Sequence, residues 1–255
     1  MKNFIFTDVT LLITHYNRSK SLERLLKSFF DLGCNFEKII VSDDSSSEFH
    51  KNYILKLQDQ FSFDFITSDI NRGLGNNINK GQEVVSTQFT LYVQEDFIPQ
   101  SCFPVVFTNS LDIINKRSDI DIVRYYAYFR YPFLNSFKHG FSDMNFKIWY
   151  WGYKKFYLYS DHPHLRRKNF SSKFGKYIEG NNGDFTEYKM MFSFLKKKGM
   201  ALFYNDFSEV FLQMNSVDEP STVKRNKWRE SNNVFIHFTR EVYRYVKFNF
   251  DYFFN

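Results

Sequence analysis

The sequence contains little cysteine and no long hydrophobic run. Its two cysteines, Cys34 and Cys102, form neither a Cys-x-x-Cys pair nor a spacing typical of a metal site. This pattern excludes a disulfide-rich secreted domain and favours a reducing compartment. No run of about 18 apolar residues occurs, so no segment is expected to span a bilayer. Asp8 interrupts the apolar N-terminus before it could act as a signal peptide, so we expect a cytoplasmic protein.

Glycine-rich phosphate loops are also missing. No G-x-G-x-x-G follows the first predicted strand, which argues against a dinucleotide-binding dehydrogenase. The sequence shows neither internal repeats nor a low-complexity linker. With 43% hydrophobic residues the chain can bury a substantial core, so it is not a disordered protein.

Aromatic residues and positive charge are abundant. The chain has 33 Phe and 17 Tyr, which fits either nucleotide bias in the source genome or a surface that stacks sugars or rests on a membrane. The net charge of +6 favours anionic partners. Residues 147–176 hold eight Lys or Arg and one acid, Asp161.

Short apolar runs rich in β-formers alternate with segments of helical periodicity. Strands are predicted at 9–14, 38–42, 63–67, 89–93, 120–126 and 200–204, and helices at 19–33, 75–85, 103–114 and 184–198. Ser19 is the expected cap of the first helix. Alternation with short loops predicts an α/β fold with a mostly parallel central sheet.

Acidic pairs follow two of these strands. Asp43 and Asp44 end the second strand, and Glu95 and Asp96 end the fourth. Ligands of open α/β sheets bind outside the carboxyl ends of the strands, so these pairs are expected to converge on one ligand. Carboxylates there suit a metal-bound diphosphate or ribose hydroxyls.

Two polar loops complete a candidate nucleotide site. The loop at 14–18 offers backbone N–H groups and Tyr16, which could stack on a base, although an ordinary polar loop remains an alternative. Arg72 opens a helix and could pair with phosphate. The predicted nucleotide-binding residues are Thr14, Tyr16, Asn17, Arg18, Asp43, Asp44, Arg72, Gly73 and Glu95.

Taken in order, these segments resemble the family-2 glycosyltransferases. The resemblance rests on residues 10–18, 41–46, 71–73 with 79–81, and 94–96 with Pro99; it covers 9–99 and, more weakly, 180–215. It implies a GT-A-type nucleotide-diphospho-sugar fold. It also implies transfer of a sugar from a UDP-, GDP- or dTDP-sugar to a hydroxyl, usually with inversion.

The resemblance assigns roles to individual acids. Asp43 would hold the base or ribose, and Asp96 would be the metal-binding aspartate of a D-x-D element, with Mn²⁺ or Mg²⁺ as cofactor. Gln94 and Gln213 stand where the family has an acid and often a histidine. If the enzyme manages without metal, Arg72, Arg166 or Arg167 could neutralise the departing phosphates.

The general base of the family opens a helix that ends in a Leu-Lys-Lys-x-Gly-like pattern, here residues 195–199. This assigns Glu187, with Asp184 as the rival, to take the proton of the acceptor hydroxyl. Alternatively, both acids only complement the helix dipole. Arg166 and Arg167 lie in a basic stretch that either binds an anionic acceptor or forms a plain surface.

The C-terminal segment, 234–255, combines apolar residues at helical spacing with intervening basic ones. It is expected either to pack on the core as a helix or to lie in a membrane interface. Peripheral attachment to the inner face of a membrane therefore remains an option.

We therefore predict a single domain over 1–215, with a nucleotide-sugar half at 1–99, an acceptor half at 100–215 and a C-terminal helical extension at 216–255. The predicted function is an inverting glycosyltransferase of surface polysaccharide synthesis. Its predicted partners are a UDP-sugar, a glycan or lipid-linked acceptor and a membrane surface, but no nucleic acid. The alternatives are a non-catalytic nucleotide- or glycan-binding module and a sugar-nucleotide nucleotidyltransferase; the loop at 14–18 is poor in glycine for the latter.

Overall fold

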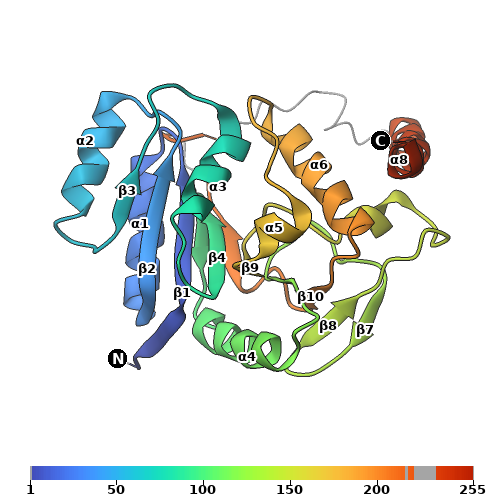
Figure 1. The fold of residues 1–255 in the computed structure, drawn as a ribbon, viewed down its shortest axis with the longest axis horizontal. Coiled ribbons are helices and arrows are strands. Elements are labelled where there is room, and N and C mark those ends of the chain that lie inside the picture. The colour runs from blue at the N-terminus through green and yellow to red at the C-terminus, as the bar shows by residue number, and fades with distance from the viewer. Residues whose placement is uncertain (1, 216–217, 221–233, 255) are drawn as a thin grey trace.

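The computed structural model describes residues 2–215, 218–220 and 234–254. Its strands are β1 (Phe4–His15), β2 (Cys34–Asp43), β3 (Asp64–Ile66), β4 (Phe89–Gln94), β5 (Phe97–Pro99), β6 (Ile122–Arg124), β7 (Leu134–Ser136), β8 (Phe141–Met144), β9 (His164–Arg167), β10 (Ala201–Tyr204) and β11 (Phe211–Gln213). Its helices are α1 (Ser19–Asp31), α2 (Glu48–Leu57), α3 (Gly73–Glu83), α4 (Phe103–Lys116), α5 (Phe170–Phe174), α6 (Gly183–Lys196) and α8 (Val234–Phe254), with a 3-10 turn η1 (Tyr153–Phe156) (Figure 1).

The central sheet has nine strands in the order β3-β2-β1-β4-β9-β6-β10-β8-β7. The first four are mutually parallel, with β1 between β2 and β4. Strand β9 runs antiparallel to both β4 and β6, so the second half of the sheet is mixed. Strands β5 and β11 form a separate two-stranded sheet. The predicted α/β fold is confirmed.

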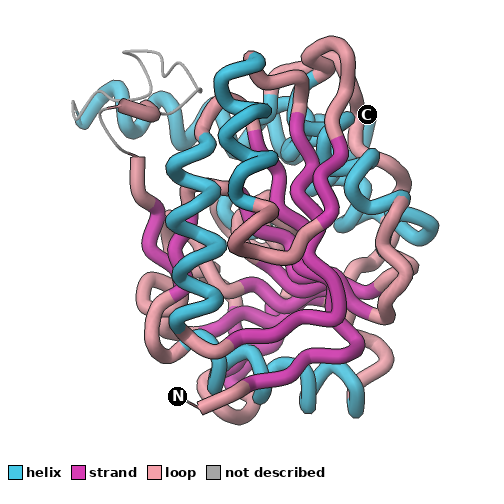
Figure 2. Tube along the Cα trace, turned by 90° about the vertical axis from the view of Figure 1, so that its left-hand side faces the viewer, coloured by secondary structure: helices cyan, strands magenta, loops and turns pink. Residues whose placement is uncertain are grey.

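Helices cover both faces of the sheet, as Figure 2 shows from the side. Alternate residues of β1 enter different cores: Leu11 and Ile13 join α1 and α4, whereas Leu12 joins α3, α5 and α6. Because both faces of this part of β1 are buried, Leu11, Leu12 and Ile13 form a continuous apolar run rather than an alternating pattern. This fits the interior position of β1, between β2 and β4.

The structure extends and corrects the predicted elements. Strand β1 begins at Phe4 rather than at residue 9, with an irregular register between Phe6 and Thr10. The segment 48–57 forms α2, which was not among the predicted elements. The expected cap of the first helix is wrong: α1 begins at Ser19 without a side-chain cap from its N-cap residue. Of the predicted extension, residues 216–217, 221–233 and 255 lie outside the described part of the chain.

A glycine sets the distance between α3 and the segment that leads into α6. A Cβ built on Gly75 would lie 2.1 Å from the Ile178 carbonyl oxygen and 3.2 Å from the Thr186 methyl group. The neighbouring atom is backbone, so it cannot swing aside as a flexible side chain would. This contact fixes the start of α6 against the nucleotide half of the sheet.

We expect Gly75→Ala to destabilise the protein by about 2 kcal/mol, because overpacking against backbone outweighs the helix propensity gained. The matched control is Gly183→Ala, whose Cβ would meet Leu74 Cδ2 at an ordinary 3.5 Å. The control should be neutral or slightly stabilising. Urea unfolding followed by circular dichroism measures both, and equal stability of the two variants would contradict the packing argument.

Candidate active site

The carboxyl ends of β1, β2 and β4 lie side by side at one edge of the sheet. His15 pairs in register with Asp43, and Thr14 pairs with Gln94. Glu95 and Asp96 follow directly after β4. The acidic strand ends expected from the sequence therefore meet at the edge where open α/β sheets bind ligands.

A chain of hydrogen bonds joins these three strand ends. His15 Nδ1 lies 2.8 Å from Asp43 Oδ1, and the Arg18 backbone N–H donates to His15 Nε2 at 3.1 Å. Because Nε2 accepts, the imidazole carries its proton on Nδ1 and donates it to the Asp43 carboxylate. Nη1 of Arg18 then lies 3.5 Å from Glu95 and 3.6 Å from Asp96.

Asp43 is a buried carboxylate within this network of hydrogen bonds. Its carboxylate also accepts hydrogen bonds from the Ser46 backbone N–H at 2.9 Å and from the Thr67 hydroxyl at 2.7 Å. Burial alone would raise the pKa of Asp43, but the hydrogen bonds from His15, Ser46 and Thr67 outweigh it and lower the pKa to about 2. With 0% of its surface exposed, Asp43 shapes the loops around the strand ends.

Asp44 fixes the backbone at the N-terminus of α3. Its two carboxylate oxygens accept from the backbone N–H groups of Arg72, at 2.9 Å, and Gly73, at 2.8 Å. Gly73 has a φ of +83° and lies against the Asn181 carbonyl, a position that a side chain would strain. Both acids of the second strand thus have protein donors, and their predicted contacts with a nucleotide stay predictions.

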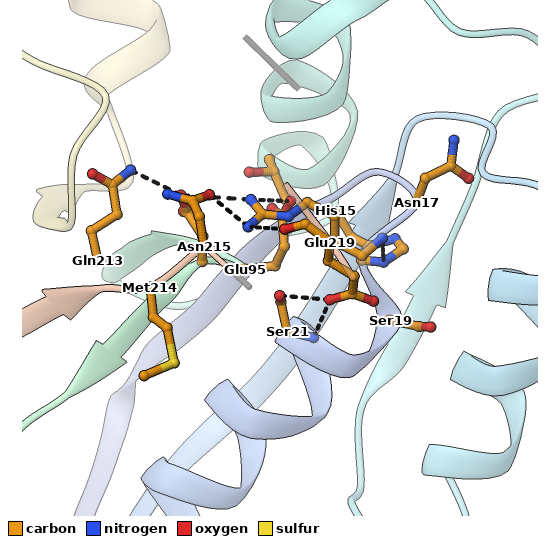
Figure 3. A network of polar contacts seen from close by, with 12 residues as sticks. His15, Asn17, Ser19, Ser21, Glu95, Gln213, Met214, Asn215 and Glu219 are labelled. Carbon is orange, nitrogen blue, oxygen red and sulfur yellow. Dashed lines mark hydrogen bonds and ion pairs between the residues drawn. The ribbon is translucent and has the colours of Figure 1, made fainter. Parts of the chain in front are cut away.

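A left-handed turn directs Arg18 into the site. Asn17 has a φ of +53°, and its side chain accepts from the Ser47 N–H at 2.8 Å. Arg18 is 4% exposed, and its Nη2 donates to Asn215 Oδ1 at 2.8 Å and to the Glu219 carbonyl at 3.2 Å. Figure 3 shows Asn215 and Glu219 close to Glu95 at this edge.

Glu219 supplies the cap that α1 lacks locally. Its carboxylate accepts from the backbone N–H groups of Lys20, at 2.9 Å, and Ser21, at 2.8 Å, and from the Ser21 hydroxyl. An anion at a helix N-terminus is favourable because the free N–H groups there are partly positive. The dashed lines between Ser21 and Glu219 in Figure 3 mark this contact.

The surroundings of Asp96 do not offer the usual ligands of a divalent cation. Gln213 donates from Nε2 to Asp96 Oδ2 at 2.8 Å, while its amide oxygen accepts from Tyr128 at 3.0 Å. Burial, and then the charge of Asp96, raise the pKa of Glu95 to about 8, so Glu95 is largely protonated at neutral pH.

Asp96 Oδ1 is buried and lacks a hydrogen-bond partner, so it could accept from a ligand. However, the described residues contain no group of three or more His, Cys, Asp or Glu that could hold a metal ion. Hard cations prefer several charged oxygen ligands. The donor set therefore fits a tightly held Mn²⁺ or Mg²⁺ poorly.

The first turn of α6 meets the end of β4 through residues 160–162. Glu187 accepts from the Asp161 N–H at 3.2 Å, and Gln94 donates to the Asp161 carbonyl at 3.4 Å. Burial raises the pKa of the partly buried Glu187, and burial followed by the charge of Glu187 raises the pKa of Asp161 to about 8. Asp184 is exposed in the same turn.

The remaining predicted residues lie elsewhere. Arg166 is completely buried and donates to Gln82 and Tyr177. Arg167 binds backbone carbonyls at the opposite end of β4, where it pairs with Phe89. Neither guanidinium group is presented to the edge that carries Asp96, so this arrangement gives no support to the predicted contact with acceptor phosphates.

Tyr16 is partly exposed in the loop after β1, whereas Thr14 is buried and its hydroxyl lies 3.0 Å from that of Tyr92. His15, Asp161, Asn215 and Glu219 were not among the predicted site residues. His15 lies in the loop predicted after the first strand. Because the first and second strands were predicted to lie in one parallel sheet, its proximity to Asp43 could have been inferred from the sequence. Nothing local in the sequence marks Glu219, because its partners lie about 200 positions away.

Comparison with solved structures supports the fold. TarS of S. aureus, residues 1–349 in complex with UDP-GlcNAc, aligns over 95% of this chain and 72% of its own, with a TM-score of 0.61 and 12% identity. A mannosyltransferase of Pyrobaculum calidifontis, in complex with GDP-Man and Mn²⁺, aligns over 74% of this chain and 51% of its own, with a TM-score of 0.50 and 9% identity.

Sequence comparison supports the family. The poly-beta-1,6-N-acetyl-D-glucosamine synthases of S. aureus and S. epidermidis share 29% and 26% identity over 90 residues, 35% of this chain. The match spans only 22% of the length of those synthases. The model of glycosyl transferase family 2 matches residues 10–175, more than half of the chain. The chain therefore belongs to glycosyl transferase family 2, and its fold is of the GT-A type.

Proposed function

We propose that the protein transfers a sugar from a nucleoside-diphosphate sugar, with UDP as the favoured nucleotide, to a hydroxyl of a glycan or glycolipid in surface polysaccharide synthesis. The supporting observation is the convergence of Asp43, Arg18 and Asp96 at one sheet edge, joined through the 160–162 segment to Glu187 on α6. Family membership favours transfer over the nucleotidyltransferase and the non-catalytic module considered from the sequence.

The domain organisation follows from this function. Residues 1–99 form the nucleotide-sugar half, because they contain the parallel strands and the loops around Asp43 and Asp44. Residues 100–215 form the acceptor half, which carries α6, and residues 216–255 form a C-terminal extension. The solved structures with UDP-GlcNAc and GDP-Man support a nucleotide-sugar as the donor.

The chemical step is a single displacement with inversion. The acceptor hydroxyl oxygen forms a bond to the anomeric carbon, while the bond from that carbon to the diphosphate oxygen breaks. Glu187 takes the hydroxyl proton, and the nucleoside diphosphate leaves with the electron pair. Glu187 suits this role better than Asp184, because its carboxylate is held beside the end of β4 by the Asp161 N–H.

Arg18 provides positive charge where the family commonly places a metal. Its guanidinium group is nearly buried and faces Glu95 and Asp96 at 3.5 and 3.6 Å. Burial raises the pKa of Glu95 to about 8, so its negative charge is largely removed at neutral pH and the Arg18 guanidinium retains capacity for an incoming anion. A preorganised cation at a departing phosphate lowers the barrier to bond cleavage.

Glu187→Gln should lower kcat about 1,000-fold, because the amide cannot take a proton. In the wild type, kcat should rise with pH through a pKa above the ordinary glutamate value, because burial raises the pKa of Glu187 and only the deprotonated form acts. The matched control, Asp184→Asn, should stay within about threefold of the wild type. Sugar transfer measured against pH tests both variants, and a larger loss in the control would assign the base to Asp184.

Chelation with EDTA should leave the transfer rate within about twofold of its starting value, because Arg18 supplies the charge that a cation would. Arg18→Ala should then reduce kcat/KM about 100-fold, the cost of one lost charged donor. Arg24→Ala, at an arginine within α1, is the control and should change little. Loss of activity in EDTA that Mn²⁺ restores would show instead that a metal is required.

A further inference from the structure

Helix α8 turns its charged side toward the protein. Lys247 and Asp251 form an ion pair, and Arg244 donates to the Tyr153 hydroxyl at 3.0 Å. Phe248 is 6% exposed and packs between these groups. A surface helix of a soluble protein normally does the opposite and buries its apolar stripe.

The outward side of α8 carries large apolar side chains. At 100° per residue they fall within a sector of roughly 160°, and this sector contains no Asp, Glu, Lys or Arg. Their exposed fractions run from 46% to 73%, for Phe238, Val242, Tyr243, Val246, Phe250, Phe253 and Phe254. A contiguous apolar surface of this kind marks an interaction site. We call this sector the outer face of α8.

Two tryptophans extend the apolar surface on one flank of the helix. Trp149 and Trp151 are 75% and 82% exposed, and the Trp151 ring lies 4.8 Å from that of Tyr245 in α8. Lys147 places its ammonium group 5.5 Å from the Trp149 ring centroid. Tryptophan and tyrosine are enriched where the acyl chains of a bilayer meet its headgroups.

A basic groove lies on the other flank, between α6 and α8. This cavity of about 240 Å³ is lined by Lys189, Lys196 and Lys197 together with Phe192. The acid in its lining is Asp251, which is paired with Lys247 of α8. The groove therefore presents an excess of positive charge next to the outer face, as anionic headgroups require.

We propose that the outer face of α8, together with Trp149 and Trp151, docks in the interface of a bilayer that contains anionic lipid. The three lysines of the groove take the phosphate headgroups. No helix in the described ranges is long and apolar enough to cross a bilayer, so α8 lies in the membrane plane.

Charge selects the bilayer over a second copy of the chain. In a two-fold contact between antiparallel α8 helices the lysines of both grooves would face one another, and between parallel helices they would face the exposed tryptophans. Anionic headgroups neutralise those lysines instead. The bilayer also accommodates the exposed tryptophans without requiring a matching pocket.

The inner side of α8 contacts α6 next to the candidate base, because Lys247 donates to the Tyr188 hydroxyl at 3.0 Å. A lipid-borne acceptor would present its hydroxyl from this side. That extension rests on the proposed function, whereas the docking itself does not.

Vesicle sedimentation tests the docking without any sugar donor. The full chain should pellet with vesicles of phosphatidylglycerol and phosphatidylcholine at low salt, and much less with phosphatidylcholine alone. Phe250→Glu should lower the bound fraction about tenfold, because it removes an apolar anchor and adds a repelled charge. Phe49→Glu is the matched control: it is 68% exposed on α2, at the opposite end of the molecule in Figure 1, and should bind as the wild type does.

A triple variant, Lys189→Gln, Lys196→Gln and Lys197→Gln, should lose the preference for phosphatidylglycerol. Failure of the wild type to pellet with either vesicle, or equal losses in both Phe→Glu variants, would overturn the proposal. A wild-type dimer in light scattering that Phe250→Glu converts to a monomer, without vesicle binding, would assign the outer face to a second copy. Because sugar transfer to a soluble acceptor is assayed separately, failure here leaves the transferase proposal standing.

Discussion

The candidate site depends on the guanidinium group of Arg18 held between the ends of β1 and β4. Asp96 is buried and Glu95 is largely shielded from solvent, and two such adjacent carboxylates are costly unless a cation or a proton compensates them. The protein uses both means, because Arg18 lies within 3.6 Å of each acid and Glu95 is held largely protonated by burial. The same guanidinium donates hydrogen bonds to Asn215 and to the Glu219 carbonyl, which holds both residues near the start of α1.

Gln94 and Gln213, which stand where the family resemblance predicts metal ligands, form hydrogen bonds within the protein. Gln94 no longer offers charge, and its side chain instead ties β4 to the Asp161 carbonyl beneath the candidate base. Gln213 binds Asp96 directly and so takes up one of its oxygens. Both amides thus link the ends of β4 and β11 to neighbouring segments of the site.

Much of the nucleotide half could be predicted from the sequence, because its signals are local. The strand ends at Asp43 and Asp96 follow from short apolar runs, and α6 was predicted at 184–198 against an observed Gly183–Lys196. Contacts between distant segments could not be predicted. Ser19 was expected to cap α1, but Glu219 binds that helix end, and the buried partners of Arg166 depend on how β9 inserts beside β4. The apolar spacing of α8 could be recognised in the sequence, but the sequence did not show that these side chains point away from the protein.

Because Gly75 has no side chain, α3 packs closely against the segment before α6, and this packing limits how the site can open. Helix α3 contacts the backbone before α6 very closely. The two parts of the protein that carry α3 and α6 therefore cannot separate without breaking this contact. At the front of the site, Gln213 donates to Asp96, Arg18 donates to Asn215, and the Lys20 N–H donates to Glu219. Such contacts exchange readily with water. We therefore expect the site to open by exchange of these hydrogen bonds rather than by separation of α3 from α6.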